Sequence, residues 1–252
     1  MSLSAAEELV QLSRELGREE RQLAILGEGN TSTDLGDGSF LVKASGTSLS
    51  TLSEAGLSRV SHAKVDHLLS RKLSEQEIED GLIACLADPT CKKPSVETFL
   101  HSLCLREPGV KWVGHTHTVS VLAVLASTQG AKPFLRHVCP DAIVVCGRHV
   151  LPIPYINPGL DLALAVRDGL ARHREAYGKP PKLVLMENHG PVALGASSAE
   201  VLNIMLMADK WAKVLLGTFA AGGPNFLSEE DAAKIDGRLD EAYRRKMIDA
   251  RA

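Results

Sequence analysis

The sequence predicts an α/β protein, because segments with helical spacing of apolar residues alternate with short apolar runs of strand length. Residues 4–16 and 74–86 show the helical spacing, and each segment opens with a Ser-x-x-Glu capping box. Residues 110–113 and 182–186 are short apolar runs of the second kind. No repeat, low-complexity linker or clear boundary interrupts this order, so we expect residues 1–252 to form a single domain.

Turn and breaker residues separate the other predicted elements. An Asp-Leu-Gly-Asp-Gly turn precedes a strand over residues 40–43. Pro94 and Ser95 predict the start of a helix, which places Glu97 in its first turn beside the positive end of the helix dipole. Further helices are expected over 61–69, 119–126, 161–177, 197–221 and 228–245, and further strands over 192–195 and, two or three of them, within 131–151, including 142–146.

Composition excludes several classes of protein. A formal net charge of −3, no basic run and only 4% aromatic residues argue against a nucleic-acid partner. Five cysteines without a C-x-x-C pair indicate reduced thiols. The first eight residues lack the order of a signal peptide, and no apolar run is long enough to span a bilayer. We therefore expect a cytoplasmic protein that does not contact a membrane.

The segment Gly114-His115-Thr116-His117 is the first candidate site. If the strand that precedes it continues, the two-residue period directs both imidazoles to the same face. Two such imidazoles form half of a zinc site, and a third ligand has to come from elsewhere in the chain. The pair is a weak signal alone, because nine histidines produce such spacings by chance.

Two loops rich in small residues could hold an anion. Residues 27–33 and 44–48 offer free backbone N–H groups and hydroxyls, and Lys43 precedes the second loop. Ordinary hairpin and surface turns explain both loops equally well. Glu97 could likewise be only a favourable partner of a helix dipole, and Lys43 an exposed strand residue.

Five segments in this order resemble the class II aldolase/adducin family: Gly29-Asn30-x-Ser32, residues 43–47, residues 94–97, residues 114–117 and residues 188–190. The resemblance implies a three-layer α/β/α fold with a mixed, largely antiparallel central sheet. It also implies Zn²⁺ as cofactor, with Mn²⁺ or Co²⁺ as alternatives because imidazoles accept all three ions. By motif, the metal ligands are His115, His117 and His189, the catalytic acid/base is Glu97, and the phosphate site is lined by Gly29, Asn30, Ser45, Gly46 and Ser95.

Two positions depart from the fuculose-phosphate aldolases of this family. Those enzymes use a tyrosine from a neighbouring subunit as second acid/base, and this chain carries His137 in the equivalent segment. His137 and Tyr155 are both candidates for that role. Val96 stands where a serine hydroxyl would bind phosphate. The sequences of residues 94–101 and 154–163 resemble more closely the larger rhamnulose-phosphate aldolase/dehydrogenase branch of the family.

The resemblance implies a zinc-dependent lyase that cleaves or forms a C–C bond in a sugar phosphate or related hydroxy-keto compound through an enediolate. Decarboxylation, epimerisation and dehydration by the same intermediate are alternatives, and a non-catalytic adducin-like interaction domain is a third. We expect a small-molecule substrate and a homotetramer. His101, one helical turn after Glu97, is placed to pack near the site. The other histidines are expected at surface or helix positions, and both tryptophans in the core.

Overall fold

Seven strands form one mixed sheet in the computed structural model, which describes residues 3–238 and 240. The strands lie in the order β3-β2-β1-β4-β7-β6-β5, and every neighbouring pair is antiparallel except the parallel pair β5–β6. The α/β fold with a mixed, largely antiparallel sheet is therefore confirmed. The bounds are β1 Asn30–Asp34, β2 Ser39–Lys43, β3 Leu57–Ser61, β4 Trp112–His115, β5 Leu151–Ile153, β6 Leu183–Met186 and β7 Gly190–Gly195.

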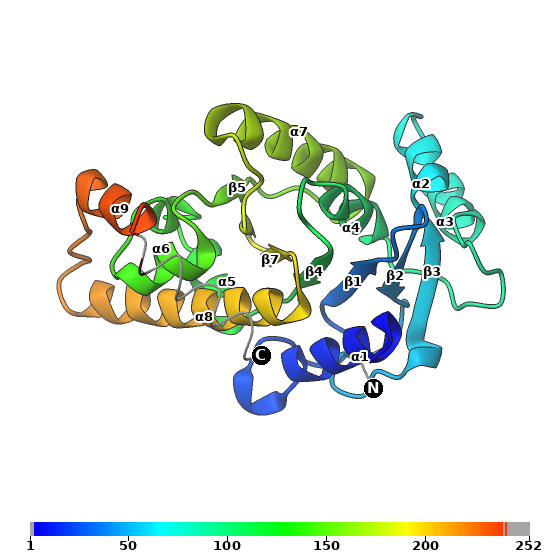
Figure 1. The fold of residues 1–252 in the computed structure, drawn as a ribbon, viewed down its shortest axis with the longest axis horizontal. Helices are drawn as coiled ribbons and strands as arrows, with labels where there is room; N and C mark the ends of the chain where they lie inside the picture. Colours follow the sequence, from blue (N-terminus) through cyan, green and yellow to red (C-terminus); the bar gives the residue numbers. More distant parts are fainter. Residues whose placement is uncertain (1–2, 239, 241–252) are drawn as a thin grey trace.

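Helices cover both faces of this sheet (Figure 1). One face carries α1 (Ala5–Leu16), α5 (Val119–Leu125), α6 (Pro140–Cys146) and α8 (Ser198–Ala220). The other face carries α2 (His62–Leu69), α3 (Glu75–Ala84), α4 (Thr98–Leu105) and α7 (Leu160–Tyr177). The helix α9 (Glu229–Asp236) contacts α6, and short 3₁₀ helices lie at Glu19–Arg21, Glu54–Gly56 and Lys132–Leu135.

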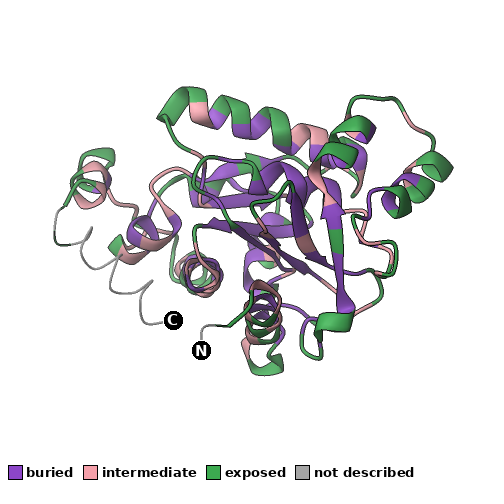
Figure 2. Ribbon diagram, turned by 45° about the vertical axis from the view of Figure 1, so that its right-hand side comes forward, coloured by how far each residue is buried: buried purple, intermediate pink, exposed green. Residues whose placement is uncertain are grey.

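The strands β6 and β7 are buried on both sides, which explains their almost continuously apolar sequences, whereas the equally central β1 buries the polar residues Asn30–Thr33. In β6, Leu183 and Leu185 pack with the helices of one face, whereas Val184 and Met186 pack with those of the other. Figure 2 shows the resulting pattern, in which buried strands lie between helices whose outer surfaces are exposed. Both expected tryptophans are buried, Trp211 completely.

Local sequence signals determine where several helices start, and one of the predicted helix starts is wrong. The capping boxes of Ser4 with Glu7 and of Ser74 with Glu77 are both formed. Helix α4, however, begins at Thr98 with Glu97 as its N-cap, not at Pro94 and Ser95. Pro94 instead pairs with Ala44 in an isolated bridge, which holds residues 94–96 outside the helix.

Two or three strands are predicted within residues 131–151, but this region contains a 3₁₀ helix, α6 and only the first residue of β5. Residues 142–146 belong to helix α6, because Pro140 occupies the first helical position after an extended Cys139. Periodicity alone cannot assign a short buried apolar run to a helix or a strand, and here the packing of this segment against α8 favours the helix. Helix α9 ends at Asp236, earlier than predicted, and residues 241–245 of the predicted helix lie outside the described residues. In the described part, no helix combines the length and apolarity that a membrane crossing requires.

Candidate active site

Three histidines meet at one end of the sheet. His115 is the last residue of β4, His117 follows it by two residues, and His189 lies in the turn between β6 and β7. Because β4 pairs with β7 so that His115 lies opposite Val192, the β6–β7 turn reaches the same end of the sheet as the His115 ring. One nitrogen atom from each of the three rings lies within 4.8 Å of the others. The structure thus brings together the three predicted metal ligands, which we call the histidine triad.

Two glycines allow the backbone to approach this closely. A Cβ atom on Gly190 would lie 2.3 Å from the Thr116 carbonyl oxygen, and a Cβ on Gly29 would lie 2.6 Å from the His115 carbonyl oxygen. Gly29 also has a positive φ of 67°, a conformation that glycine adopts without strain. Glycine at these two positions is therefore required for the turns to close on the histidine triad.

The ring nitrogens have the arrangement that a metal site needs. The Nδ1–H of His115 donates to the Pro191 carbonyl oxygen at 3.0 Å, so Nε2 is the ring nitrogen that faces the triad and is available to a metal ion. The Nε2 atoms of His115 and His117 are 3.2 Å apart. A tetrahedral ion with Zn–N bonds of about 2.0–2.1 Å would place neighbouring nitrogens about 3.3–3.4 Å apart. The triad therefore fits a divalent metal ion.

Glu97 is the carboxylate beside the triad. Its Oε1 atom lies 3.0 Å from Nε2 of His189 and 3.4 Å from Nε2 of His115, and its Oε2 accepts a hydrogen bond of 2.6 Å from the Asn30 amide. Burial of the carboxyl group raises its pKa, but the two imidazoles outweigh this effect and hold the pKa of Glu97 well below its usual range. The carboxylate is ionised at neutral pH in the metal-free protein.

The pKa values of His115 and His117 are shifted in opposite directions. Burial lowers the pKa of His115, but the nearby Glu97 carboxylate outweighs it, so that this pKa is raised. Burial and the two neighbouring rings lower the pKa of His117 to about 4. His117 is therefore neutral at pH 7, the form in which an imidazole can bind a metal ion. The Nδ1 atom of His189 is buried and has no hydrogen-bond partner among the described residues.

The two predicted anion loops lie side by side around Lys43. The Lys43 ammonium group is buried and donates to the carbonyl oxygens of Gly27, at 3.3 Å, and Thr47, at 2.6 Å. The backbone N–H of Ser45 donates to the Lys93 carbonyl oxygen, which brings residues 45–47 next to residues 93–95. Burial lowers the pKa of Lys43. No carboxylate of the described residues forms an ion pair with this lysine, which we had expected to be exposed.

Not every predicted residue lies where a phosphate site requires it. Gly46 and Ser45 are exposed and Ser95 is half-buried, so these three border the loops around Lys43. The Asn30 side chain has a different position: its oxygen contacts His101 and its nitrogen donates to Glu97. In this position it supports the carboxylate.

Neither candidate for the second acid/base stands at the triad. His137 is buried and stacks on Trp211, with ring centroids 5.0 Å apart. A ring held in the core of its own chain cannot reach a substrate bound at the triad or on another copy. Tyr155 is 55% exposed, and its hydroxyl donates to Asn157 at 2.9 Å. Sequence reasoning missed Glu28, whose carboxylate lies 3.8 Å from Nδ1 of His117 and which the Gly-Glu-Gly-Asn turn positions.

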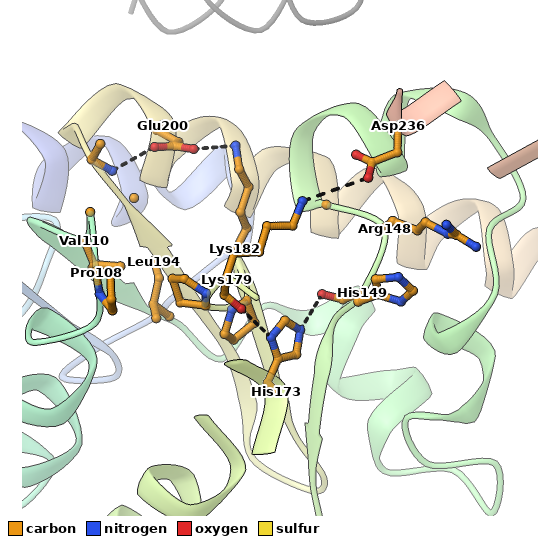
Figure 3. Close-up of a pocket in the computed structure, with 16 residues that line it drawn as sticks. Pro108, Val110, Arg148, His149, His173, Lys179, Lys182, Leu194, Glu200 and Asp236 are labelled. Atoms are coloured by element: carbon orange, nitrogen blue, oxygen red, sulfur yellow. Dashed lines mark hydrogen bonds and ion pairs between the residues drawn. The ribbon is translucent and has the colours of Figure 1, made fainter. Parts of the chain in front are cut away.

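A cavity of about 280 Å³ lies at the opposite end of the sheet, before β4 and after β7 (Figure 3). Its lysines are already paired, Lys182 with Glu200 at 2.5 Å and Lys179 with Asp236 at 4.0 Å. Both ring nitrogens of the buried His173 contact backbone carbonyl oxygens. These contacts hold loops together, and the cavity is separate from the histidine triad.

Comparison with known proteins gives the family. The chain belongs to the family described as Class II Aldolase and Adducin N-terminal domain, whose model matches residues 7–216. This places the chain in an enzyme superfamily whose class II aldolases depend on a metal ion and act on small molecules. The histidine triad agrees with that metal dependence.

Two curated relatives have similar sequences. "Uncharacterized oxidoreductase YuxG" of Bacillus subtilis is 29% identical over 201 residues, which cover 76% of this chain and 27% of that protein. The chain thus spans about a quarter of this relative. The "3-oxo-tetronate 4-phosphate decarboxylase" of Pectobacterium atrosepticum is 28% identical over 224 residues, which cover 86% of each chain.

Solved structures agree on the fold. YgbL of Klebsiella pneumoniae superposes with a TM-score of 0.69 at 26% identity, over 91% of this chain and 96% of that chain. The L-fuculose-1-phosphate aldolase of Thermus thermophilus superposes with a TM-score of 0.60 at 20% identity, over 86% and 96%. The second similarity concerns the fold alone.

Proposed function

We propose that this chain is a metal-dependent lyase that breaks a C–C bond beside a ketone in a small phosphorylated substrate. Loss of CO₂ from a 3-oxo sugar acid is the first candidate reaction. The observation that carries the proposal is the position of Glu97 Oε1, 3.0 Å from His189 Nε2 and 3.4 Å from His115 Nε2. A divalent ion held by the histidine triad, Zn²⁺ or alternatively Mn²⁺ or Co²⁺, would supply a Lewis acid that stabilises the negative charge of an enediolate.

Glu97 performs the proton transfer in this reaction. When a 3-oxo acid loses CO₂, the C1–C2 bond breaks and its electron pair remains as an enediolate on C2, C3 and their oxygens. C2 must then receive a proton. Because Glu97 is ionised in the metal-free protein, it first takes up a proton from water at Oε1 and then delivers it to C2, which returns the carboxylate to its ionised form. No residue has to remove a proton from the substrate before the bond breaks.

Decarboxylation requires a single proton donor, which makes it the first candidate over aldol cleavage. Aldol cleavage requires a group that takes the proton from the hydroxyl that becomes the aldehyde. Glu97 lies 3.0 and 3.4 Å from two rings of the triad and is placed as the single proton donor, and the Glu28 carboxylate lies 3.8 Å from the third. His137 packs in the core, and Tyr155 bonds Asn157. A relative that matches most of both chains is named as a decarboxylase, which supports the same choice.

The buried cation of Lys43 supports an anionic substrate. The Lys43 ammonium group has no ion-pair partner among the described residues, although the Glu97 carboxylate acts on it from a greater distance. A bound phosphate at the loops 27–30 and 44–47 would bring an opposite charge into contact with it. Ser45, Gly46 and Ser95 border these loops and would donate further hydrogen bonds. We therefore propose a phosphate monoester as the anionic group of the substrate.

Aldol cleavage of a ketose phosphate is the second candidate, because it passes through the same enediolate. The residue we propose as second acid/base for it is the exposed Tyr155, acting on a neighbouring copy in a homotetramer. Ile25 and Leu26 support such a contact, since they are 54% and 83% exposed in the turn that leads to the site.

The two candidates give different products. Zinc-loaded protein should be incubated in D₂O with 3-oxo-tetronate 4-phosphate and, separately, with ketose 1-phosphates. The first candidate predicts release of CO₂ and one deuterium at the protonated carbon of the ketone product. Release of an aldehyde from a ketose 1-phosphate without CO₂ formation would support the second. Purified protein that binds no metal and converts neither substrate would contradict both, and would favour a non-catalytic interaction domain.

A further inference from the structure

A chain of buried hydrogen bonds leads from β1 to the Glu97 carboxylate. The hydroxyl of Ser32 lies 2.6 Å from Nδ1 of His101, Nε2 of His101 contacts the side-chain oxygen of Asn30, and the Asn30 amide nitrogen lies 2.6 Å from Oε2 of Glu97. Ser32 and His101 are completely buried, and Asn30 is 3% exposed. These contacts link residues 69 and 71 positions apart in the sequence.

The hydrogen bond from the Asn30 amide nitrogen to Glu97 Oε2 sets the direction of the other bonds in this chain. Glu97 Oε2 can only accept, so the Asn30 group facing it must be the NH₂. The Asn30 oxygen then faces His101, and Nε2 of His101 must carry the proton that it donates. Nδ1 of a neutral His101 is left as an acceptor for the Ser32 hydroxyl. One arrangement of protons satisfies all four residues.

We propose that His101 is a positioning residue that, through Asn30, determines which oxygen of Glu97 exchanges the proton with the substrate. With Oε2 held by the Asn30 amide, Oε1 is the oxygen that faces the histidine triad. Rotation of the carboxyl group would break the bond to Asn30, so the base is fixed before the substrate binds. This inference rests on the proposed function, because it assigns a role within the same proton transfer.

The surroundings of His101 keep the arrangement in place at neutral pH. Burial lowers the pKa of His101 to about 3, with the Glu97 carboxylate acting in the opposite direction and His115 and Lys43 in the same direction. The ring therefore remains neutral and keeps a single N–H. A neutral ring is what the bond directions require, since a doubly protonated ring would lose the acceptor for Ser32.

The first test reads the proton positions and needs no substrate. Nitrogen NMR of uniformly labelled, zinc-loaded protein, with His101→Gln used for assignment, should show His101 as the neutral Nε2–H tautomer with a slowly exchanging proton. Replacing Asn30 by leucine should make that proton exchange faster by at least about ten-fold, because its acceptor is removed. A Nδ1–H tautomer or a doubly protonated ring at pH 7 would overturn the proposal.

The second test measures turnover. His101→Phe keeps a flat ring but removes both nitrogens. It should lower kcat by about 10–100-fold, because the Glu97 carboxylate is no longer held in position, with KM within about two-fold and zinc content unchanged. His101→Gln, whose amide can again donate to Asn30, should recover about ten-fold. His173→Phe is the matched control, because it removes a buried histidine with two hydrogen bonds at the far end of the sheet and should leave kcat unchanged.

The outcomes separate the two proposals. Equal kcat in His101→Phe and wild type, or no recovery in His101→Gln while both proteins are folded and zinc-loaded, would overturn the positioning role. If the wild type converts no keto-acid or ketose phosphate, the proposed function fails, and the NMR result still decides the bond directions. If His101→Phe does not fold, Ser32→Ala offers a smaller change at the other end of the chain, with a loss in kcat of a few-fold expected.

Discussion

Replacing Glu97 by glutamine removes the proposed proton carrier while keeping its shape. The amide oxygen of a glutamine at this position can accept the Asn30 hydrogen bond that Oε2 accepts now at 2.6 Å. The amide nitrogen then occupies the position of Oε1, 3.0 Å from His189 and 3.4 Å from His115. The side chain stays in place, but it can no longer take up or release a proton during the reaction.

General acid–base catalysis by one positioned side chain contributes about 10²–10⁴-fold, so Glu97→Gln should lower kcat by that factor, or about 2.7–5.4 kcal/mol in activation free energy. KM should change by less than about three-fold, because the loops around Lys43 are not altered. Zinc content should remain at about one ion per chain, because all three imidazoles are retained. The assay is steady-state release of CO₂ or ketone product, with metal analysis of the same samples.

Glu200→Gln is a suitable control. The Glu200 side chain is 14% exposed, close to the 12% of Glu97, and it lies at the opposite end of the sheet in an ion pair with Lys182. Its replacement should leave kcat unchanged. Turnover within about five-fold of wild type in a zinc-loaded Glu97→Gln protein would refute this role of Glu97, since another residue would then carry the proton.

Three further predictions concern the metal, the substrate anion and acid stability. His117→Ala should lose most bound zinc in metal analysis, whereas replacement of the exposed His67 by alanine should not; full stoichiometry in His117→Ala would contradict the ligand set. Lys43→Met should raise KM for phosphorylated substrates about 10–100-fold, because one charged hydrogen bond to the phosphate is lost. Lys182→Met serves as control. Equal KM values in Lys43→Met and wild type would show that Lys43 is not part of the anion site. Because burial lowers the pKa of His101 from 6.5 to about 3, the unfolded chain binds a proton in this pH range that the folded chain does not. His101 alone should therefore lower the unfolding free energy by about 1.4 kcal/mol per pH unit as the pH falls from 6.5 towards 3, and denaturant titrations should show a shallower fall for His101→Gln; parallel curves would contradict the neutral buried ring.

Local signals in the sequence were sufficient where the structure is determined locally. The capping boxes at Ser4 and Ser74 fix the starts of α1 and α3, because both partners lie within four residues of each other. The strand and helix assignment failed at 142–146, where packing of α6 against α8 decides the outcome. The start of α4 was placed too early, because the bridge between Ala44 and Pro94 could not be seen in the local pattern.

In the candidate site, too, some features are visible in the local sequence and others depend on long-range contacts. The spacing of His115 and His117 is visible in the sequence, although β4 ends at the first of the two. His189 reaches them only through the pairing of β4 with β7, a long-range contact that no local pattern reports, and the family resemblance supplied it. Lys43 was expected at the surface, because the position of a single strand lysine depends on the loops that fold over it.

X-ray absorption at the metal edge of the purified, zinc-loaded protein is the most direct test of the histidine triad as a metal site. We predict about one zinc per chain, with a first shell that contains three imidazole nitrogens at about 2.0–2.1 Å. In His189→Ala the imidazole contribution should fall by one third or the metal should be lost. A spectrum without imidazole scattering, or one that is identical in wild type and His189→Ala, would contradict the metal site and the lyase activity derived from it.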